Sequence, residues 1–217
     1  MRRYQAVLLD VDGTLVDSND AHAWVEALAE HDVEVGWSQV RRLIGMGGDR
    51  IVELLVGLPR DADANEEIGA RRAEIFRERW LRTITPFPRT RDFMLLLRAE
   101  GYHYAIASAA RGEELTALLE IADIADLCEV ATTSSDVEES KPHPDIVEAT
   151  LARLPVERHR AVMIGDTPYD LAAARGAYID MIGVTTGGWT RDALAGCVGV
   201  FAGVADLRAR WPETPLG

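Results

Sequence analysis

The chain has 217 residues, of which 23 are Lys or Arg and 36 are Asp or Glu, so its formal net charge is −13. Nucleic acids and anionic membranes bind proteins through basic surfaces, and this acidic balance argues against both as partners. The two cysteines lie far apart in the sequence, which fits a reducing compartment. The first apolar run stops at Asp10, well short of the about 18 apolar residues of a membrane span, so we expect a cytoplasmic protein.

The first predicted element is a buried strand that leads directly into two carboxylates. Residues 6–9 read Ala-Val-Leu-Leu and are followed by Asp10-Val11-Asp12-Gly13. Such a short, apolar run suits the centre of a parallel sheet covered by helices on both faces. Asp10 and Asp12 can then reach one small volume at the carboxyl end of the strand, where open α/β sheets bind ligands. Carboxylates about 4 Å apart repel by about 4 kcal/mol at an effective dielectric of about 20, so a shared proton or a divalent cation must compensate.

Residues 17–85 contain helical signals and no convincing strand, and we call this segment the helical module. Apolar residues at helical spacing predict helices over 21–29, 40–44, 51–55 and 65–82. Ser18 or Asn19 is available to cap the first helix, and Ser38 the second. The sequence Thr-Pro-Phe-Pro over 85–88 is a natural return linker. We therefore expect the module to be inserted into a core domain formed by residues 1–16 and 86–217.

The remainder of the chain alternates amphipathic helices with short apolar strands, which is typical of βαβ units in a parallel sheet. The expected strands cover residues 103–107, 127–131, 161–164 and 179–184. The expected helices cover residues 91–100, 113–121, 145–153 and 171–175, and a looser tail contains residues 198–201 and 205–210. The predicted fold class is α/β.

Polar residues follow the later strands, as they follow the first. Ser108 comes after strand 103–107, and the segment Gly165 to Asp170 comes after strand 161–164. Lys141 lies in a loop before a further helix. In a parallel sheet these strand ends share one edge, so carboxylates, a hydroxyl and an ammonium would meet there.

In order and approximate spacing, these segments resemble the four motifs of the haloacid dehalogenase superfamily, in its phosphatase branch with a helical cap. The matching residues are Asp10-Val11-Asp12-Gly13-Thr14-Leu15, then Ser108, then Lys141-Pro142, and finally Gly165-Asp166 with Asp170. The resemblance, to phosphoglycolate phosphatases and β-phosphoglucomutases in particular, implies a Rossmann-like core with the helical module as its cap. It also implies Mg²⁺-dependent hydrolysis of a small phosphorylated metabolite through an aspartyl-phosphate.

The resemblance assigns a role to each matching residue. Asp10 is the nucleophile, Asp12 is the general acid and base, and Mg²⁺ is bound by Asp10, Asp166 and the Asp12 carbonyl. The expected phosphate-binding residues are Gly13, Thr14, Ser108, Ala109 and Lys141. Asp170 would orient Lys141 or a metal-bound water, although Thr167 to Asp170 also fits a helix capping box. Read alone, Ser108 also fits a helix cap, and Lys141 a solvated loop residue.

The chain departs from the family pattern on the substrate side. Ala110 occupies a position where phosphoglycolate-type phosphatases and sugar phosphomutases often carry a lysine, and Arg111 is placed to substitute for that cation. The glycine-rich break before residue 51 is the other candidate for specificity, although it also fits a plain interhelical loop. Its candidate residues are Gly47, Gly48 and Arg50.

The nearest alternative to a phosphatase is a sugar phosphomutase, which would use the same intermediate and stays open at this level. A phosphorylation-switched receiver would use a similar set of residues, but the order of the motifs argues against it. Dehalogenase activity is disfavoured, because Asp12 supplies an acid that a departing halide does not need. The intact set of acids argues against a non-catalytic interaction protein. The sequence leaves monomer and homodimer equally open.

Overall fold

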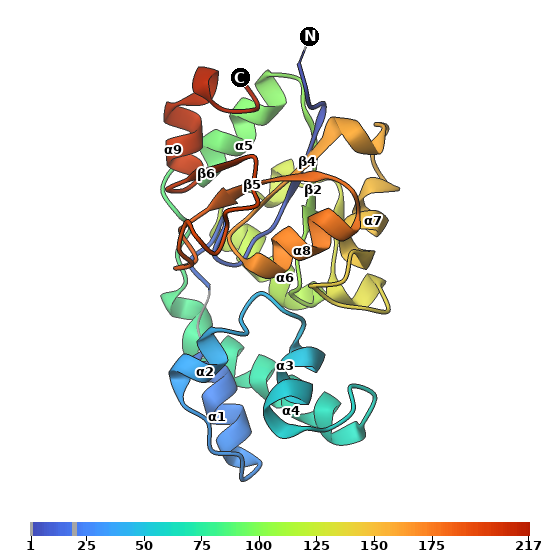
Figure 1. The fold of residues 1–217 in the computed structure, drawn as a ribbon. Helices are drawn as coiled ribbons and strands as arrows, with labels where there is room; N and C mark the ends of the chain where they lie inside the picture. The colour runs from blue at the N-terminus through green and yellow to red at the C-terminus, as the bar shows by residue number, and fades with distance from the viewer. Residues whose placement is uncertain (1, 19–20) are drawn as a thin grey trace.

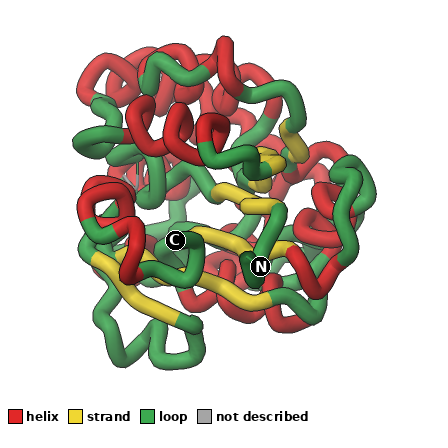
Figure 2. Tube along the Cα trace, turned by 90° about the horizontal axis from the view of Figure 1, so that it is seen from above, coloured by secondary structure: helices red, strands yellow, loops and turns green. Residues whose placement is uncertain are grey.

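The computed structural model describes residues 2–18 and 21–217. A parallel sheet lies between two layers of helices (Figures 1 and 2), which confirms the predicted α/β, Rossmann-like class. The strand order is β3-β2-β1-β4-β5-β6. The strands are β1 (Ala6–Leu9), β2 (His103–Ala107), β3 (Ala131–Thr132), β4 (Ala161–Gly165), β5 (Asp180–Val184) and β6 (Gly199–Phe201). Because each neighbouring pair is parallel, the carboxyl ends of these strands lie at one edge.

The side chains of β1 alternate between two hydrophobic clusters, one on each face of the sheet. Val7 and Leu9 pack with one layer of helices, whereas Ala6 and Leu8 pack with the other. The first layer consists of α5 (Thr90–Ala99), α6 (Gly112–Ile121) and α9 (Val204–Ala209). The second consists of α7 (Asp145–Leu151) and α8 (Pro168–Gly176). Burial on both faces explains why this strand is apolar throughout.

The helical module stands at the carboxyl edge of the sheet, at the opposite end of the molecule from both termini (Figure 1). It contains α1 (His22–Glu30), α2 (Trp37–Arg41), α3 (Gly48–Val56), α4 (Asp63–Ile75), the π-helical turn η1 (Phe76–Trp80) and the 3₁₀ turn η2 (Leu81–Thr83). Its interior is a separate hydrophobic cluster that includes Trp24, Leu28 and Ile51. The two segments that join it to the sheet run antiparallel at Val16 and Pro86.

Three predicted elements differ from the structure. The helix expected over 40–44 begins and ends earlier, because α2 ends at Arg41. Residues 127–131 were expected to be a strand, but Leu127 is buried at the end of the 3₁₀ turn η3 (Ala125–Leu127), and only β3 pairs with the sheet. The helix expected over 65–82 ends as an α-helix at Ile75 and continues as η1 and η2. In these last turns the Trp80 indole N–H donates to Glu26 of α1, a tertiary contact that helical periodicity does not contain.

The predicted helix caps were also partly wrong. The residue before α1 is Ala21, and Ser18 turns its hydroxyl elsewhere, while Asn19 lies outside the described residues. Ser38 is inside α2, which begins after Gly36. The remaining short turns are η4 (Ser134–Asp136), η5 (Arg158–Arg160) and η6 (Trp211–Glu213). No helix among the described residues is long and apolar enough to cross a membrane.

Candidate active site

Asp10 and Lys141 form a buried ion pair at the centre of the sheet edge. The Asp10 amide donates to the Ile164 carbonyl (3.0 Å), which extends the pairing of β1 with β4 by one residue. The Lys141 Nζ atom lies 2.7 Å from Asp10 Oδ1 and donates to the Ala107 carbonyl at the end of β2 (2.9 Å). Lys141 is 1% exposed, so it is not a solvated loop residue.

Asp170 combines the two roles that its sequence context suggests, one on each carboxylate oxygen. Its Oδ1 atom lies 2.8 Å from Lys141 Nζ. Its Oδ2 atom accepts from the amide (3.0 Å) and hydroxyl (2.7 Å) of Thr167, and thereby caps α8. A Cβ on Gly165 would lie 2.7 Å from Asp170 Cγ, so a glycine is needed for this approach. The capping box thus fixes the carboxylate that faces the lysine.

Three buried carboxylates are close enough to share a cation. One oxygen from each of Asp10, Asp166 and Asp170 lies within 4.8 Å of the others. The Thr14 hydroxyl lies 3.1 Å from Asp10 Oδ2 and 3.3 Å from Asp166 Oδ1, and so bridges two of these acids. A donor set made only of oxygens suits Mg²⁺ and disfavours zinc.

The Asp12 carboxylate faces away from this cluster, toward two hydroxyls. Ser18 Oγ donates to Asp12 Oδ1 (2.5 Å), and Ser108 Oγ lies 3.4 Å from Asp12 Oδ2. Ser108 also accepts from the Ala110 amide (3.1 Å), but it does not cap the next helix, because α6 begins after Arg111 without a side-chain cap. Ser18 is not among the residues that the sequence predicts for the site. The sequence feature that points to it is Gly13, whose positive φ (80°) lets the chain turn back, so that Val16 lies beside Asp12.

The expected phosphate-binding backbone lies in the turn after β1. The Gly13 amide donates to the Val16 carbonyl (2.8 Å), and the Thr14 amide donates to the Val11 carbonyl (3.1 Å). Both amides close the turn in the described structure, and the phosphate-binding role of Gly13 and Thr14 stays a prediction. Ala109 lines the cavity beside Asp10.

Burial and crowding set the electrostatics of the site. Burial raises the pKa of Asp10 from 3.8 to about 7, despite the opposing effect of Lys141. Burial, and next the Glu114 carboxylate, raise the pKa of Asp12. Burial alone would lower the pKa of Lys141, but the carboxylates of Asp10 and Asp170 outweigh it, and its pKa is raised. The lysine is therefore held charged among acids that also attract protons or a cation.

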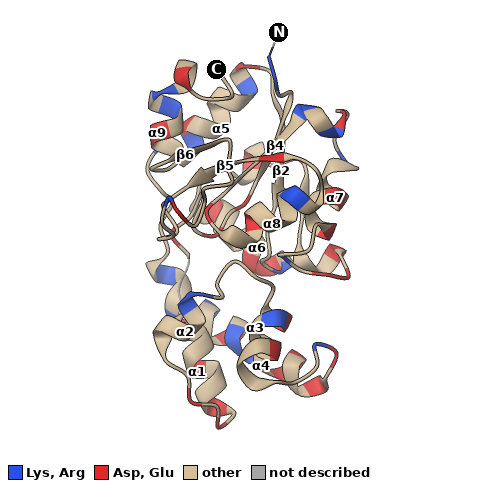
Figure 3. Cartoon of the chain, viewed as in Figure 1, with Lys and Arg blue, Asp and Glu red and all other residues tan. Residues whose placement is uncertain are grey.

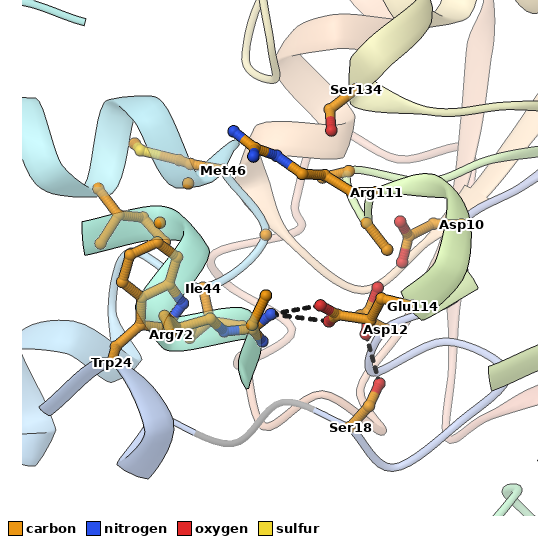
Figure 4. A pocket seen from close by; sticks show the side chains of 17 residues that line it. Asp10, Asp12, Ser18, Trp24, Ile44, Met46, Arg72, Arg111, Glu114 and Ser134 are labelled. Atoms are coloured by element: carbon orange, nitrogen blue, oxygen red, sulfur yellow. Dashed lines mark hydrogen bonds and ion pairs between the residues drawn. The ribbon is translucent and has the colours of Figure 1, made fainter. Parts of the chain in front are cut away.

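A cavity of about 90 Å³ connects Asp10 and Asp12 to the helical module (Figure 4). Arg72 of α4 and Glu114 of α6 meet in its wall, with Arg72 Nη1 2.6 Å from Glu114 Oε2. The module side also contributes apolar residues, among them Trp24, Ile44, Met46 and Ile51. Sequence patterns gave no signal for Arg72 or Glu114, because each is an ordinary charged residue on a helix.

The specificity candidates fall into two groups. Gly48 and Arg111 line the cavity. Gly47 packs against the core, since a Cβ there would lie 2.2 Å from Ser140 Cβ. Arg50 Nη2 donates to Glu139 Oε2 (2.8 Å), and Arg60 binds the same carboxylate. In the described structure, Gly47 and Arg50 therefore contribute to the contact between module and core.

Comparisons with known proteins agree with this geometry. A family model for haloacid dehalogenase-like hydrolases matches residues 7–184. The chain is 30% identical over 195 residues to the "Probable phosphatase IndB" of Dickeya dadantii, covering 87% of this chain and 84% of that protein. It is 29% identical over 215 residues to a phosphoglycolate phosphatase of Rhodospirillum rubrum, covering 94% and 89%, respectively. A solved hydrolase from Pseudomonas syringae superposes with a TM-score of 0.89 at 26% identity, covering 96% of this chain and 98% of that one.

The family match spans most of the chain, and two of these relatives cover nearly all of it. The resemblance drawn from the four motifs is confirmed. The chain belongs to the haloacid dehalogenase-like hydrolase family.

Proposed function

We propose that this chain is a Mg²⁺-dependent phosphatase that hydrolyses a small phosphorylated metabolite through an aspartyl-phosphate on Asp10. The observation that carries the proposal is the buried group in which Lys141 Nζ lies 2.7 Å from Asp10 and 2.8 Å from Asp170, beside Asp166. The names of the relatives from Dickeya dadantii and Rhodospirillum rubrum support phosphate-ester hydrolysis.

In the first step, an Asp10 oxygen attacks phosphorus, and the bond from phosphorus to the leaving oxygen breaks. Asp12 gives its proton to the departing alkoxide, a role that is typically worth about 10²- to 10⁴-fold in rate. The raised pKa of Asp12 supports the protonated starting state that this step needs. Ser18 and Ser108 hold the Asp12 carboxyl group on the side of the cavity.

In the second step, Asp12 takes a proton from water, which attacks phosphorus and releases Asp10 and inorganic phosphate. Lys141 and Ser108 are placed to stabilise the charge on the phosphoryl oxygens during both steps. Thr14 and Asp170 act as positioning residues, because Thr14 bridges Asp10 to Asp166 and Asp170 fixes the lysine. The two-step route divides one difficult displacement into two easier ones.

The residues that would hold Mg²⁺ are Asp10 and Asp166, with the Asp12 carbonyl as proposed from the sequence and Asp170 nearby. The fit rests on the all-oxygen donor set and its spacing within 4.8 Å. When bound, the ion would neutralise the repulsion among these acids and polarise the phosphoryl group.

We further propose that the helical module is a cap that excludes water and selects the leaving group. Its supporting observations are the cavity wall that it supplies and the Arg72–Glu114 ion pair that links it to the core. On the same basis, the domain boundaries are 1–16 and 86–217 for the core and 17–85 for the cap. The two isolated, unpaired cysteines support a cytoplasmic location.

The test is the release of inorganic phosphate from an aryl phosphate in the presence of Mg²⁺. Asp10→Asn should lower kcat by more than about 10³-fold, because the nucleophile is lost. Asp92→Asn is the matched control, since it makes the same change on the exposed surface of α5. Normal hydrolysis by the Asp10 variant would contradict the proposal.

Product analysis separates the proposal from the phosphomutase alternative. Free phosphate from a sugar phosphate indicates hydrolysis, whereas an isomerised sugar phosphate indicates transfer. A receiver-type switch would instead accumulate a long-lived acyl phosphate, which a short-lived intermediate excludes.

A further inference from the structure

The module segment 45–49 contacts the surroundings of the buried Lys141 from two sides. The segment belongs to the connection from α2 to α3, and Figure 1 shows this connection arching toward the core. One contact is with Thr167, the residue before α8. The other is with Ser140, the residue before Lys141 in the sequence. Both core residues are buried, so the segment reaches past the surface of the core.

The first contact is made by Gly45. Its φ of 105° lies in the region that favours glycine, and a Cβ on Gly45 would lie 2.6 Å from Thr167 Cγ2. The amide and the hydroxyl of Thr167 both donate to Asp170, the acid that pairs with Lys141. The module backbone therefore packs directly on the capping box that fixes one partner of the lysine.

The second contact is made by Gly47 and Asp49. A Cβ on Gly47 would lie 2.2 Å from Ser140 Cβ, so the two backbones approach closely only because Gly47 has no side chain. Ser140 is 6% exposed, and its hydroxyl donates to Asp49 Oδ1 (3.0 Å). Because Ser140 directly precedes Lys141, this hydrogen bond restrains the backbone from which the lysine side chain extends.

Asp49 is itself fixed within the module. It lies in the first turn of α3, and its backbone carbonyl accepts from the side-chain amide of Asn65 in α4 (2.9 Å). Asn65 is buried, so this second hydrogen bond is protected from water. Two hydrogen bonds thus connect the interior of the module, through Asp49 and Ser140, to the residue next to Lys141.

The neighbouring ion pairs hold the same loop at a different point. Arg50 and Arg60 bind Glu139, which is partly exposed and one residue farther from the lysine than Ser140. Ion pairs between partly exposed, flexible side chains fix a position only weakly, whereas a hydrogen bond has a preferred distance and direction. We therefore expect Glu139 to hold the module on the core, and Ser140 to set the place of the lysine.

We propose that Asp49 is a positioning residue for Lys141 and that it acts through Ser140. This inference rests on the proposed phosphatase function. Lys141 faces the phosphoryl group, which every substrate shares, so loss of the link should lower kcat by a similar factor for all esters. The preference among esters should stay the same. The segment 45–49 then contributes to the rate of the reaction, in contrast to the role in substrate choice that the sequence suggested.

Phosphate release from an aryl phosphate and from glycerol 3-phosphate tests the link. Asp49→Ala removes the acceptor and should lower kcat about tenfold for both esters, the effect of one hydrogen bond to a charged group, while KM changes less. Asp49→Asn keeps an oxygen acceptor and should retain most of kcat, although it loses the charge that faces Arg60. Asp63→Ala is the matched control, because it makes the same change at an exposed position in the first turn of α4. An unchanged kcat in Asp49→Ala would overturn the inference.

A double-variant cycle shows whether Asp49 and Ser140 act as one unit. Ser140→Ala should lower kcat by the same factor as Asp49→Ala, and the double variant should lower it no further, because all three lack the same hydrogen bond. Ser135→Ala is the control for the serine, since Ser135 is exposed in the same core segment. Losses that multiply in the double variant, or a changed preference between the two esters, would contradict the proposed link.

Hydrogen exchange separates failure of this inference from failure of the proposed function, because it requires no turnover. The His143 amide donates to the Ser140 carbonyl (3.0 Å), so its exchange reports on the loop that carries Lys141. In Asp49→Ala, the peptide covering 139–145 should exchange about tenfold faster, and in the matched control it should not change. Unchanged exchange in Asp49→Ala would overturn the inference whether or not the protein is a phosphatase. If exchange is faster but the unmodified protein hydrolyses no ester, the link stands and the phosphatase proposal fails.

Discussion

Charged side chains on the core side and on the module side of the cavity differ in burial and in their partners. On the core side, the buried Lys141, in the loop before α7, pairs with two buried acids: Asp10, which follows β1, and Asp170, in the first turn of α8. On the module side, arginines are partly exposed and reach across to acids of the core, as in the Arg72–Glu114 pair. Figure 3 shows charges of both signs scattered over both parts of the molecule. Under the proposed function, we expect the chemical step to depend on the core, and substrate choice and closure to depend on contacts across the boundary.

The largest effect is expected when Lys141, the buried cation of the core side, is replaced. Lys141→Met leaves Asp10 and Asp170 buried without their partner, which should lower the free energy of unfolding by about 3–5 kcal/mol. It should also lower kcat by at least about 10²-fold, because a charge-stabilising donor is lost. Denaturant titration and phosphate release measure the two effects.

A second variant separates stability from chemistry at Lys141. Adding Asp170→Asn to Lys141→Met removes one unpaired carboxylate and should recover part of the stability without recovering kcat. Recovery of both would show that Lys141 has only a structural role.

The pH dependence of stability tests the crowding of the acids. Because folding raises the pKa of Asp10 from 3.8 to about 7, the folded protein holds more protons in that interval. Stability of the metal-free protein should therefore fall as pH rises from about 4 to about 7. Mg²⁺ binds the ionised form, so it should raise Tm more at about pH 8 than at about pH 5.5.

Differential scanning calorimetry in EDTA and in excess Mg²⁺ measures the increase in Tm that Mg²⁺ causes. In Asp10→Asn this increase in Tm should be smaller and should lose most of its pH dependence. An equal increase in Tm at both pH values in the unmodified protein would contradict the proposed assignment of Asp10 to the metal site.

An intermediate effect is expected at the ion pair between α4 and α6. The Glu114 carboxylate contributes to the raised pKa of Asp12, so Glu114→Gln should lower that pKa and leave Asp12 a poorer proton donor at alkaline pH. The loss in kcat should reach about tenfold for alkyl phosphates, which need the proton. Aryl phosphates, with better leaving groups, should change less. Equal losses for both ester types would indicate a purely structural role.

The smallest effect is expected at Glu139, where two arginines of the module bind one carboxylate of the core. Glu139→Gln weakens a partly exposed ion-pair cluster, so KM should rise by about two- to fivefold while kcat changes little. Added salt should reduce the difference between the variant and the unmodified protein. A large fall in kcat would show that Glu139 also positions Lys141, two residues away.

The sequence predicted the core side better than the module side, for a physical reason. Asp10, Ser108 and Asp166 directly follow apolar strands, and a parallel sheet brings such positions to one edge whatever the details of packing. Arg72 and Glu114 meet only through a tertiary contact between α4 and α6, which periodicity does not encode, and Ser18 reaches Asp12 only because the chain turns back after Gly13. The prediction of a strand over 127–131 was wrong for a related reason. The turn η3 buries the Leu127 side chain as well as a strand would, so an apolar residue at this position does not distinguish the two.

The joint between the two parts of the molecule has a consequence for the evolution of the chain. Asp17 donates to the Thr85 carbonyl (2.9 Å), and Phe87 donates to the Leu15 carbonyl (3.0 Å), so the module begins and ends at hydrogen-bonded neighbours. A short hairpin could span this joint and leave the order of the sheet strands unchanged. If the module selects the substrate, as proposed, its exchange at this position would change the substrate while Asp10 and Asp166 keep their places.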